Sequence, residues 1–262
     1  FGIVLGVMAL IIVLSVMNGL EGYQKQQVLS SIPHAIVSPN GKVKIDDAEP
    51  TMPNFVQKAV PINMTNVIFQ TAGGVSAGQV IGIRQFSDDP ILSTLPEQNF
   101  EDLLPTGEFK IIIGDQLAQK LNLHAGDKVR LMITENSQYT PFGRVPLQRL
   151  FTVSEIYFET GEVSGYEAFA NLTDIGRLMR IQPGEAQGFR LFLTDPFQIT
   201  ELPVAFPTAT QITDWRMQKG EFFQAVRMEK NMMGLLVSLI IVVAVSNIIT
   251  SLSLMVVDKQ GE

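Results

Sequence analysis

The sequence predicts an α+β domain, divided into two small lobes, between two transmembrane α-helices. Two uncharged apolar runs, residues 1–20 and 231–257, stand at the two ends of the chain. About 20 such residues form a helix that crosses the roughly 30 Å of bilayer hydrocarbon. Between them, strand and helix patterns alternate, as in α+β folds. We expect residues 1–32 to form the first span and its stalk, 33–213 the domain, and 214–262 the second stalk and span.

The composition excludes several kinds of chemistry. The 262 residues carry a net charge of −7 and no long basic run, so nucleic acid is not an expected partner. There is no cysteine, which excludes disulfides, thiol catalysis and cysteine-ligated metal within the chain. The first residue, Phe1, already lies inside an apolar run, so we interpret the chain as part of a longer protein.

The first apolar run favours a membrane span over a cleaved signal peptide. A signal peptide has a shorter apolar region that ends at a small-residue cleavage site. Here the run passes into a polar segment with helical spacing, Glu21–Ser31, which stops at Pro33. We therefore expect the helix to continue out of the membrane as a stalk.

The second apolar run is flanked by Lys230 and Asp258. Small polar residues in a span usually face another helix or a cavity rather than lipid. This run contains four of them: Ser246, Asn247, Thr250 and Ser251. The preceding segment, 214–229, has helical apolar spacing. It forms either the start of one long helix or a separate amphipathic helix packed on the domain.

Apolar alternation and turn residues predict the elements of the central domain. One short helix, Gln116–Leu121, is expected to be capped by Asp115, and a second covers Asp174–Met179. Gly126 and Asp127 predict a turn. The predicted strands are Asn66–Thr71, Gly78–Ile83, Lys110–Ile113, Lys128–Ile133, Leu147–Phe158 and Gly188–Leu193.

Few residues suggest catalysis. Residues 74–78 match G-x-S-x-G, but a nucleophile elbow needs a helix after the serine. Residues 79–83 have a strand pattern instead, so a glycine-rich hairpin is the preferred interpretation. His34 and His124 lack the spacing of a zinc site, and the sequence contains no phosphate-binding loop. We expect a non-catalytic chain with no metal site.

One segment, residues 134–146, is longer than a hairpin connection requires. Within it, Thr140–Gly143 has proline at the second and glycine at the fourth position of a type I turn. This puts the apolar Phe142 at the apex of an arm that Pro141 and Pro146 stiffen. A stiff apolar projection suits insertion into a groove of a partner. The alternative is a flap that folds back and buries Phe142 in its own domain.

Several segments together resemble the lipoprotein-releasing (Lol) permeases. In the spans the resemblance is carried by Gly6–Leu10, Leu14–Gly19, Val226–Leu236, Asn247–Leu252 and Lys259–Glu262. The arm, followed by Gln148–Phe151, is similar to the hook of LolC-type (or hook-bearing LolF-type) subunits, and this separates them from LolE. The resemblance runs through the whole chain and is least diagnostic over residues 40–105.

The resemblance implies an inner-membrane permease subunit of an ABC transporter, with its large domain in the periplasm and a fold like that of MacB and FtsX. Such a subunit pairs with a second permease, either LolE or a second copy of itself. A LolD-type ATPase dimer binds ATP and Mg²⁺, so this chain needs no cofactor and is not an enzyme. The complex extracts triacylated lipoproteins from the inner membrane and passes them to the periplasmic chaperone LolA.

The resemblance also assigns roles to residues. A chaperone-binding pad below the hook matches Arg130, Gln148 and Arg149. Arginine suits this role because a guanidinium can fork onto carbonyls or carboxylates; for Arg130 the alternative is a solvated strand charge. Phe142 stands where we expect a methionine in the family. The hook residues are Gln138, Tyr139, Thr140, Pro141, Phe142, Gly143 and Arg144.

A permease of this kind must shelter acyl chains in an apolar cavity. Flexible methionines suit varied chains, and the cavity would lie where the helices meet a partner near the periplasmic side. The candidate cavity residues are Met17, Leu20, Met228 and Met232. Plain helix packing is the alternative role for each of them.

Two other classes share the topology of two spans around an extracytoplasmic domain. In sensor kinases and chemoreceptors, a signalling module would follow the second span. Mechanotransmitting permeases related to MacB and FtsX should lack a Pro-Phe-Gly tip followed by Gln-Arg.

Overall fold

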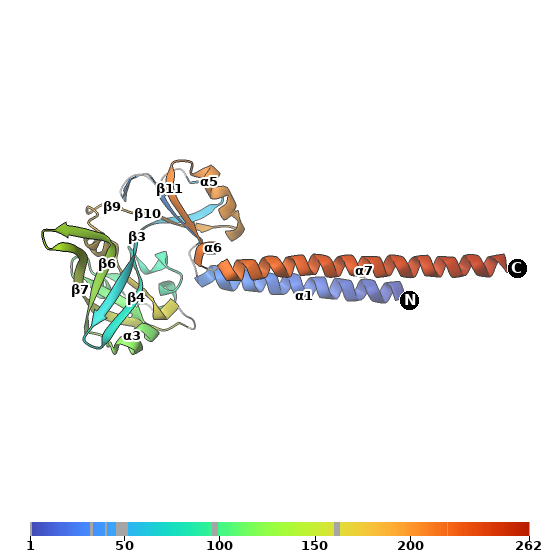
Figure 1. The fold of residues 1–262 in the computed structure, drawn as a ribbon, viewed down its shortest axis with the longest axis horizontal. Coiled ribbons are helices and arrows are strands. Elements are labelled where there is room, and N and C mark those ends of the chain that lie inside the picture. The colour runs from blue at the N-terminus through green and yellow to red at the C-terminus, as the bar shows by residue number, and fades with distance from the viewer. Residues whose placement is uncertain are drawn as a thin grey trace. The chain divides into compact units, whose positions relative to one another are not determined.

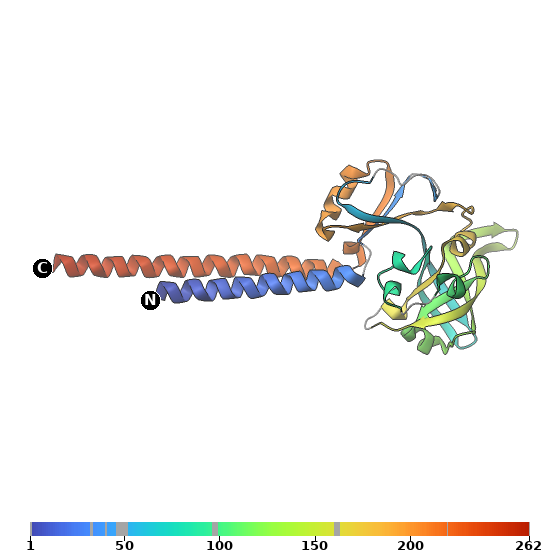
Figure 2. The same ribbon diagram turned by 180° about the vertical axis from the view of Figure 1, so that it is seen from behind.

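The computed structural model describes residues 2–31, 34–39, 41–45, 52–95, 99–159, 163–218 and 220–261. Contacts divide the chain into two units. One is Phe1–Ser30 with Trp215–Glu262, and the other is Ser31–Asp214. The first unit holds the long helices and the second holds the sheets (Figures 1 and 2).

The helical unit consists of α1 (Gly2–Ser31), α6 (Trp215–Gln218) and α7 (Gly220–Gln260). Within it, Gly2–Tyr23 and Asn231–Gln260 are long and apolar enough to cross a membrane. Helix α7 runs without a break from its polar start into the apolar stretch. From residue 220 onwards the stalk and the span are therefore one helix, and the alternative of a separate amphipathic helix is wrong for this part.

The second unit is built on a sheet of nine strands in the order β11-β1-β10-β3-β4-β8-β5-β7-β6, with a pair β2–β9 beside it. Its strands are β1 (Ala35–Pro39), β2 (Val43–Lys44), β3 (Val56–Thr71), β4 (Gly74–Ile83), β5 (Lys110–Gly114), β6 (Lys128–Thr140), β7 (Gly143–Tyr157), β8 (Glu167–Asn171), β9 (Glu185–Ala186), β10 (Gly188–Leu193) and β11 (Ala209–Asp214). Its α-helices are α2 (Phe100–Leu103), α3 (Asp115–Leu121), α4 (Leu172–Leu178) and α5 (Leu202–Ala205).

The long strand β3 divides this sheet into two lobes. Its first half pairs with β10, and its second half pairs with β4. A further pairing of β3 with β6 joins the strands β3-β4-β8-β5-β7-β6 into a closed ring. The remaining strands β11-β1-β10, with the first half of β3, form the other lobe. The α+β class and the two lobes are thus confirmed.

The core of the ring explains the apolar runs of its strands. Every strand of the ring contributes buried side chains to one cluster, and α3 and α4 add to it. In β5, Ile111 and Ile113 belong to this cluster, whereas Ile112 between them belongs to a second buried cluster. A strand buried on both faces has a continuous apolar sequence rather than an alternating one, as Lys110–Ile113 does.

Three sequence-based expectations change. Asp115 is the first residue of α3 rather than its cap, because Gly114 takes the N-cap position. Strands β1, β8 and β11 and the first half of β3 were not predicted. Pro61 lies inside β3, where a proline argues against a strand, and β8 is a short buried strand without alternation. Ser76 lies within β4, opposite Phe69, so residues 74–78 begin a strand of the β3–β4 hairpin, and the turn that was expected there lies just before them, at residues 72–73.

Candidate functional site

The arm is the end of the β6–β7 hairpin. Thr140 pairs with Gly143, so only Pro141 and Phe142 form the connecting loop. The Thr140 hydroxyl donates to the carbonyl oxygen of Gly143 at 2.8 Å. Gly143 has a φ of +115°, which a residue with a Cβ rarely adopts. These features fix a tight loop at the tip.

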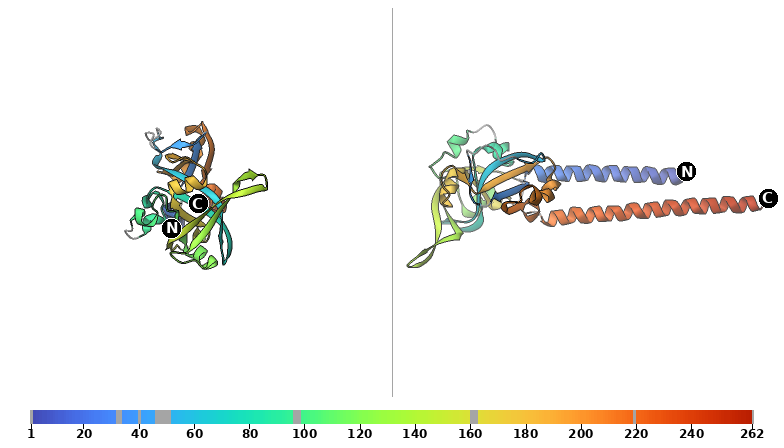
Figure 3. Two further views of the ribbon diagram at one scale, coloured as in Figure 1. Left: turned by 90° about the vertical axis from the view of Figure 1, so that its left-hand side faces the viewer. Right: turned by 90° about the horizontal axis from the view of Figure 1, so that it is seen from above.

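The expected long loop is largely strand. Strand pairing resumes at Gln138–Val145 and continues to the tip, after an irregular stretch that follows Ile133. Near this stretch, the Asn66 side chain of β3 donates to Glu135 Oε1 at 3.1 Å. Figure 3 shows the hairpin projecting from the rest of its unit. A two-stranded ribbon is stiffer than a loop because cross-strand hydrogen bonds fix its backbone.

Phe142 at the tip is 99% exposed. The alternative of a flap that buries this ring in its own domain therefore does not describe this structure. Tyr139 and Arg144 face each other across the ribbon, and the arginine donates to the tyrosine hydroxyl. The Arg144 Cζ lies 4.7 Å from the centroid of the Tyr139 ring. A cation–π pair therefore orders the two strands next to the tip.

The three pad residues divide between the two faces of the hairpin. Directly opposite residues share a face, and the pairs are Arg130 with Leu150, Met132 with Gln148, and Leu131 with Arg149. Arg130 and Gln148 therefore lie on one face as diagonal neighbours, and both are exposed. Arg149 belongs to the other face, the one that carries the buried Leu131. The structure brings two of the three residues together, but not the third.

Arg149 lies at the rim of the core. Its Cζ is 3.5 Å from the centroid of the Phe109 ring, and this ring packs edge-to-face on Phe151 at 5.6 Å. Phe109 donates its backbone N–H to Asp174. Burial raises the pKa of Asp174, and two backbone N–H donors and the nearby Arg177 and Arg149 oppose that rise. The sequence offered no signal for Phe109, because it lies in an irregular segment before β5.

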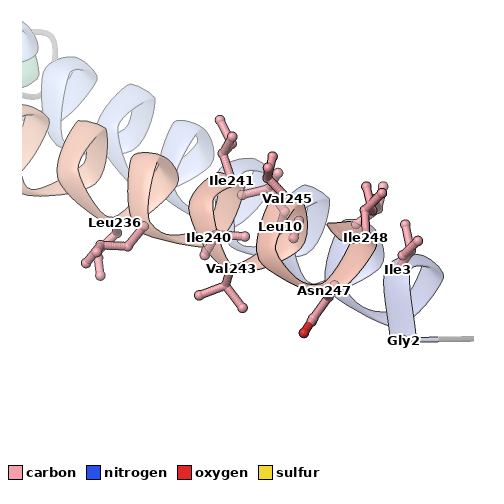
Figure 4. A pocket seen from close by; sticks show the side chains of 14 residues that line it. Gly2, Ile3, Leu10, Leu236, Ile240, Ile241, Val243, Val245, Asn247 and Ile248 are labelled. Carbon is pink, nitrogen blue, oxygen red and sulfur yellow. The ribbon is translucent and has the colours of Figure 1, made fainter. Parts of the chain in front are cut away.

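An open apolar groove with a volume of about 410 Å³ lies between α1 and α7. Figure 4 shows Ile3 and Leu10 of α1 beside Ile240 and Ile248 of α7 in its lining. The lining comes from the first ten residues of the chain and from residues 236–248. The candidate acyl-chain residues Met17, Leu20, Met228 and Met232 do not line it, and the last three are exposed. Their role stays a prediction.

Comparison with known proteins covers the whole chain. Residues 1–182 match the family model described as MacB-like periplasmic core domain. The chain is 77% identical, over its full length, to the lipoprotein-releasing system transmembrane protein LolC of Haemophilus influenzae, and 35% identical to the protein of that name from Neisseria meningitidis. Identity to LolE of H. influenzae is 25% over the full length. The chain spans 65–66% of the length of these relatives. The resemblance to LolC-type proteins is thus confirmed.

Proposed function

The chain belongs to the family of MacB-like periplasmic core domains, and from that premise we propose that it is a LolC-type permease subunit of a lipoprotein-releasing ABC transporter in the inner membrane. Its much higher identity to LolC than to LolE of one organism supports this subunit type. The two apolar helices and the domain between them suit a permease whose domain lies in the periplasm.

Such a permease has to move the acyl chains of a lipoprotein out of the bilayer without exposing them to water. Each methylene of an acyl anchor exposed to water costs about 0.8 kcal/mol, so a triacylated lipoprotein does not leave the bilayer unaided. A cavity between transmembrane helices shelters the chains, with Met17, Leu20, Met228 and Met232 as candidate lining residues. Energy comes from a LolD-type ATPase dimer that binds ATP and Mg²⁺, because this chain has no phosphate-binding loop.

The hook and the pad act in the hand-off to the chaperone LolA. The observation that carries this proposal is the nearly complete exposure of Phe142 on a stiff ribbon. Exposed aromatic tips are costly in water and gain free energy when a groove covers them. Arg130, Gln148 and Arg149 supply polar contacts beneath the tip. The second permease of the complex is LolE or another copy of this chain.

A mechanotransmitting permease is the second candidate, because the matching family model is named for MacB. Such a permease would use the domain to move a partner and would not need an apolar tip. A polar substitution at Phe142 therefore distinguishes the two functions: it should block lipoprotein release by a hook-bearing permease and leave a mechanotransmitting permease unaffected. None of the relatives named above is described as a sensor.

The test replaces Phe142 in the full-length subunit, in cells that have no other copy. Phe142→Asp should leave lipoproteins in the inner membrane, because burying a carboxylate in an apolar groove costs several kcal/mol. The matched control Phe142→Met should release them normally, since such apolar exchanges usually cost under about 1.5 kcal/mol. Inner- and outer-membrane fractions are compared by immunoblot. Normal release by Phe142→Asp, at unchanged subunit level, would exclude the hook function.

A further inference from the structure

The contact between Arg149 and Phe109 fixes how the guanidinium lies. The Cζ of Arg149 is 3.5 Å from the ring centroid, which is van der Waals contact. A guanidinium tilted steeply at this distance would push a nitrogen into the ring, so its plane lies close to parallel with the ring. Its N–H donors then point sideways, along the surface of the domain, because they lie in the guanidinium plane.

Phe109 is held in place by its own neighbours. Its φ is +53°, a conformation uncommon for a bulky residue. The Asp174 carboxylate accepts the Phe109 N–H at 3.1 Å and the Gly107 N–H at 2.8 Å. Asp174 is fully buried in the first turn of α4. The carboxylate therefore orders the segment that carries the ring, and Phe151 packs against the ring from the core.

The charge of Arg149 acts on the nearby Asp174 carboxylate, but the described part of the domain shows no acceptor bonded to the Arg149 donors. Within the described ranges, no hydrogen bond or ion pair of its guanidinium is found, although the side chain is ordered against Phe109 and is exposed. A side chain ordered before binding loses less conformational entropy when it binds. The N–H groups at the edge of a stacked guanidinium lie in one plane. They therefore suit acceptor oxygens in that plane, namely those of a carboxylate or of main-chain carbonyls.

We propose that Phe109 is a positioning residue: its ring holds Arg149 so that the guanidinium edge meets a carboxylate or main-chain carbonyl of the chaperone. This inference rests on the proposed function. It separates Arg149, which is ordered by stacking on one face of the hairpin, from Arg130 and Gln148 on the other face. It also predicts that lysine cannot replace arginine at this position, because an ammonium has no plane to stack.

The test is a double-mutant cycle on the complete chain in detergent, with LolA binding measured by calorimetry. Phe109→Leu keeps an apolar side chain and removes the aromatic face, and it should weaken binding about two- to five-fold, the range of an exposed cation–π contact. Phe109→Tyr keeps the face and should bind normally. In the Arg149→Ala background, Phe109→Leu should cause no further loss, because its effect acts through the arginine.

A second measurement reports on the stack without the chaperone. In a chain labelled with ¹⁵N-arginine, the Arg149 Nε–H signal should be shifted by the ring current, and Phe109→Leu should abolish this shift while Phe109→Tyr keeps it. Two results would show that the positioning role is wrong: Phe109→Leu does not weaken LolA binding, or it weakens binding by the same factor in the Arg149→Ala background. If Phe142→Asp still abolishes binding in either case, the hook function stands. If wild-type chain does not bind LolA, or Phe142→Asp binds normally, the proposed function itself fails.

Discussion

At the scale of single residues, two phenylalanines close in sequence have opposite surroundings. Phe142 is 99% exposed at the tip, whereas Phe151 is fully buried and contacts the ring of Phe109. Phe151→Ala should lower the free energy of unfolding by about 3–5 kcal/mol, because it leaves a cavity in the core. Phe142→Ala should change it by at most about 0.5 kcal/mol. Denaturant unfolding followed by circular dichroism measures both.

This comparison also tests the arm. A Phe142→Ala variant that loses as much stability as Phe151→Ala would mean that the tip packs on the domain in solution. The exposed fraction of the ring in the structure predicts the opposite.

At the scale of elements, a buried ion pair joins the two lobes. Arg190 of β10 is 2% exposed, and its Nη1 lies 2.6 Å from Oδ2 of Asp89, in the segment after β4. Arg190→Met should destabilise the domain by about 3–5 kcal/mol, because it leaves a buried carboxylate without its cation. Adding Asp89→Asn should recover part of this loss. Denaturant midpoints and slopes of the single and double variants give the values.

The control for this prediction is an ion pair in the same region whose arginine is partly exposed. The side chain of Arg84 is 44% exposed, and its Nε lies 4.0 Å from the buried Asp88, which also has the Lys58 ammonium at 3.4 Å. Arg84→Met should cost at most about 1 kcal/mol, because solvent screens the exposed guanidinium and Asp88 keeps Lys58 as its cation. Equal losses for Arg84→Met and Arg190→Met would mean that the burial of the arginine does not set how much each ion pair contributes to stability.

The sequence predicted the elements whose pattern is local, and missed those that depend on distant pairing. Lys128–Ile133 alternates clearly and forms part of β6, whereas β1 and β11 are short strands that depend on pairing with segments far away in the chain, β1 with β10 and β11, and β11 with β1. The arm was located and its tip residue was predicted, because Pro141 and Gly143 are local turn signals. Its ribbon form was missed, since its strand pairing depends on register with the other half of the hairpin.

The pad shows the same limit at the candidate site. Its residues were grouped because they are close in sequence or on neighbouring strands, but the register sends Arg149 to the other face from Gln148. A shift of one position along a strand reverses the face of a side chain. Phe109 and Asp174 were missed because their relation to Arg149 is purely spatial, across more than twenty residues of chain.

At the scale of the whole molecule, the two apolar helices and the domain between them demand a defined topology. Both ends of the domain lead into α1 and α7, so the two spans cross the bilayer in opposite directions and the domain lies on one side. The end of the apolar helix Asn231–Gln260, which carries Asp258, then reaches the other side. With the family's periplasmic domain, the expected arrangement is domain in the periplasm and Asp258 near the cytoplasm.

Single cysteines test this topology cleanly, because the chain has none of its own. Gln119 is exposed on α3, so Gln119→Cys should react with a membrane-impermeant maleimide in cells whose outer membrane alone is permeable. Leu117 lies two residues earlier on the same helix and is 0% exposed. Leu117→Cys should therefore stay unlabelled in the folded domain, which separates burial from sidedness.

The third variant, Asp258→Cys, should react only after the inner membrane is lysed, because the second span has to place residue 258 across the bilayer from the domain. Labelling is measured by the gel shift of a maleimide-linked polymer. If Gln119→Cys is protected until lysis while Asp258→Cys reacts before it, the orientation is inverted. Reaction of both before lysis would mean that the second apolar helix does not span the bilayer, since the roughly 30 Å of hydrocarbon would then not separate the two sites.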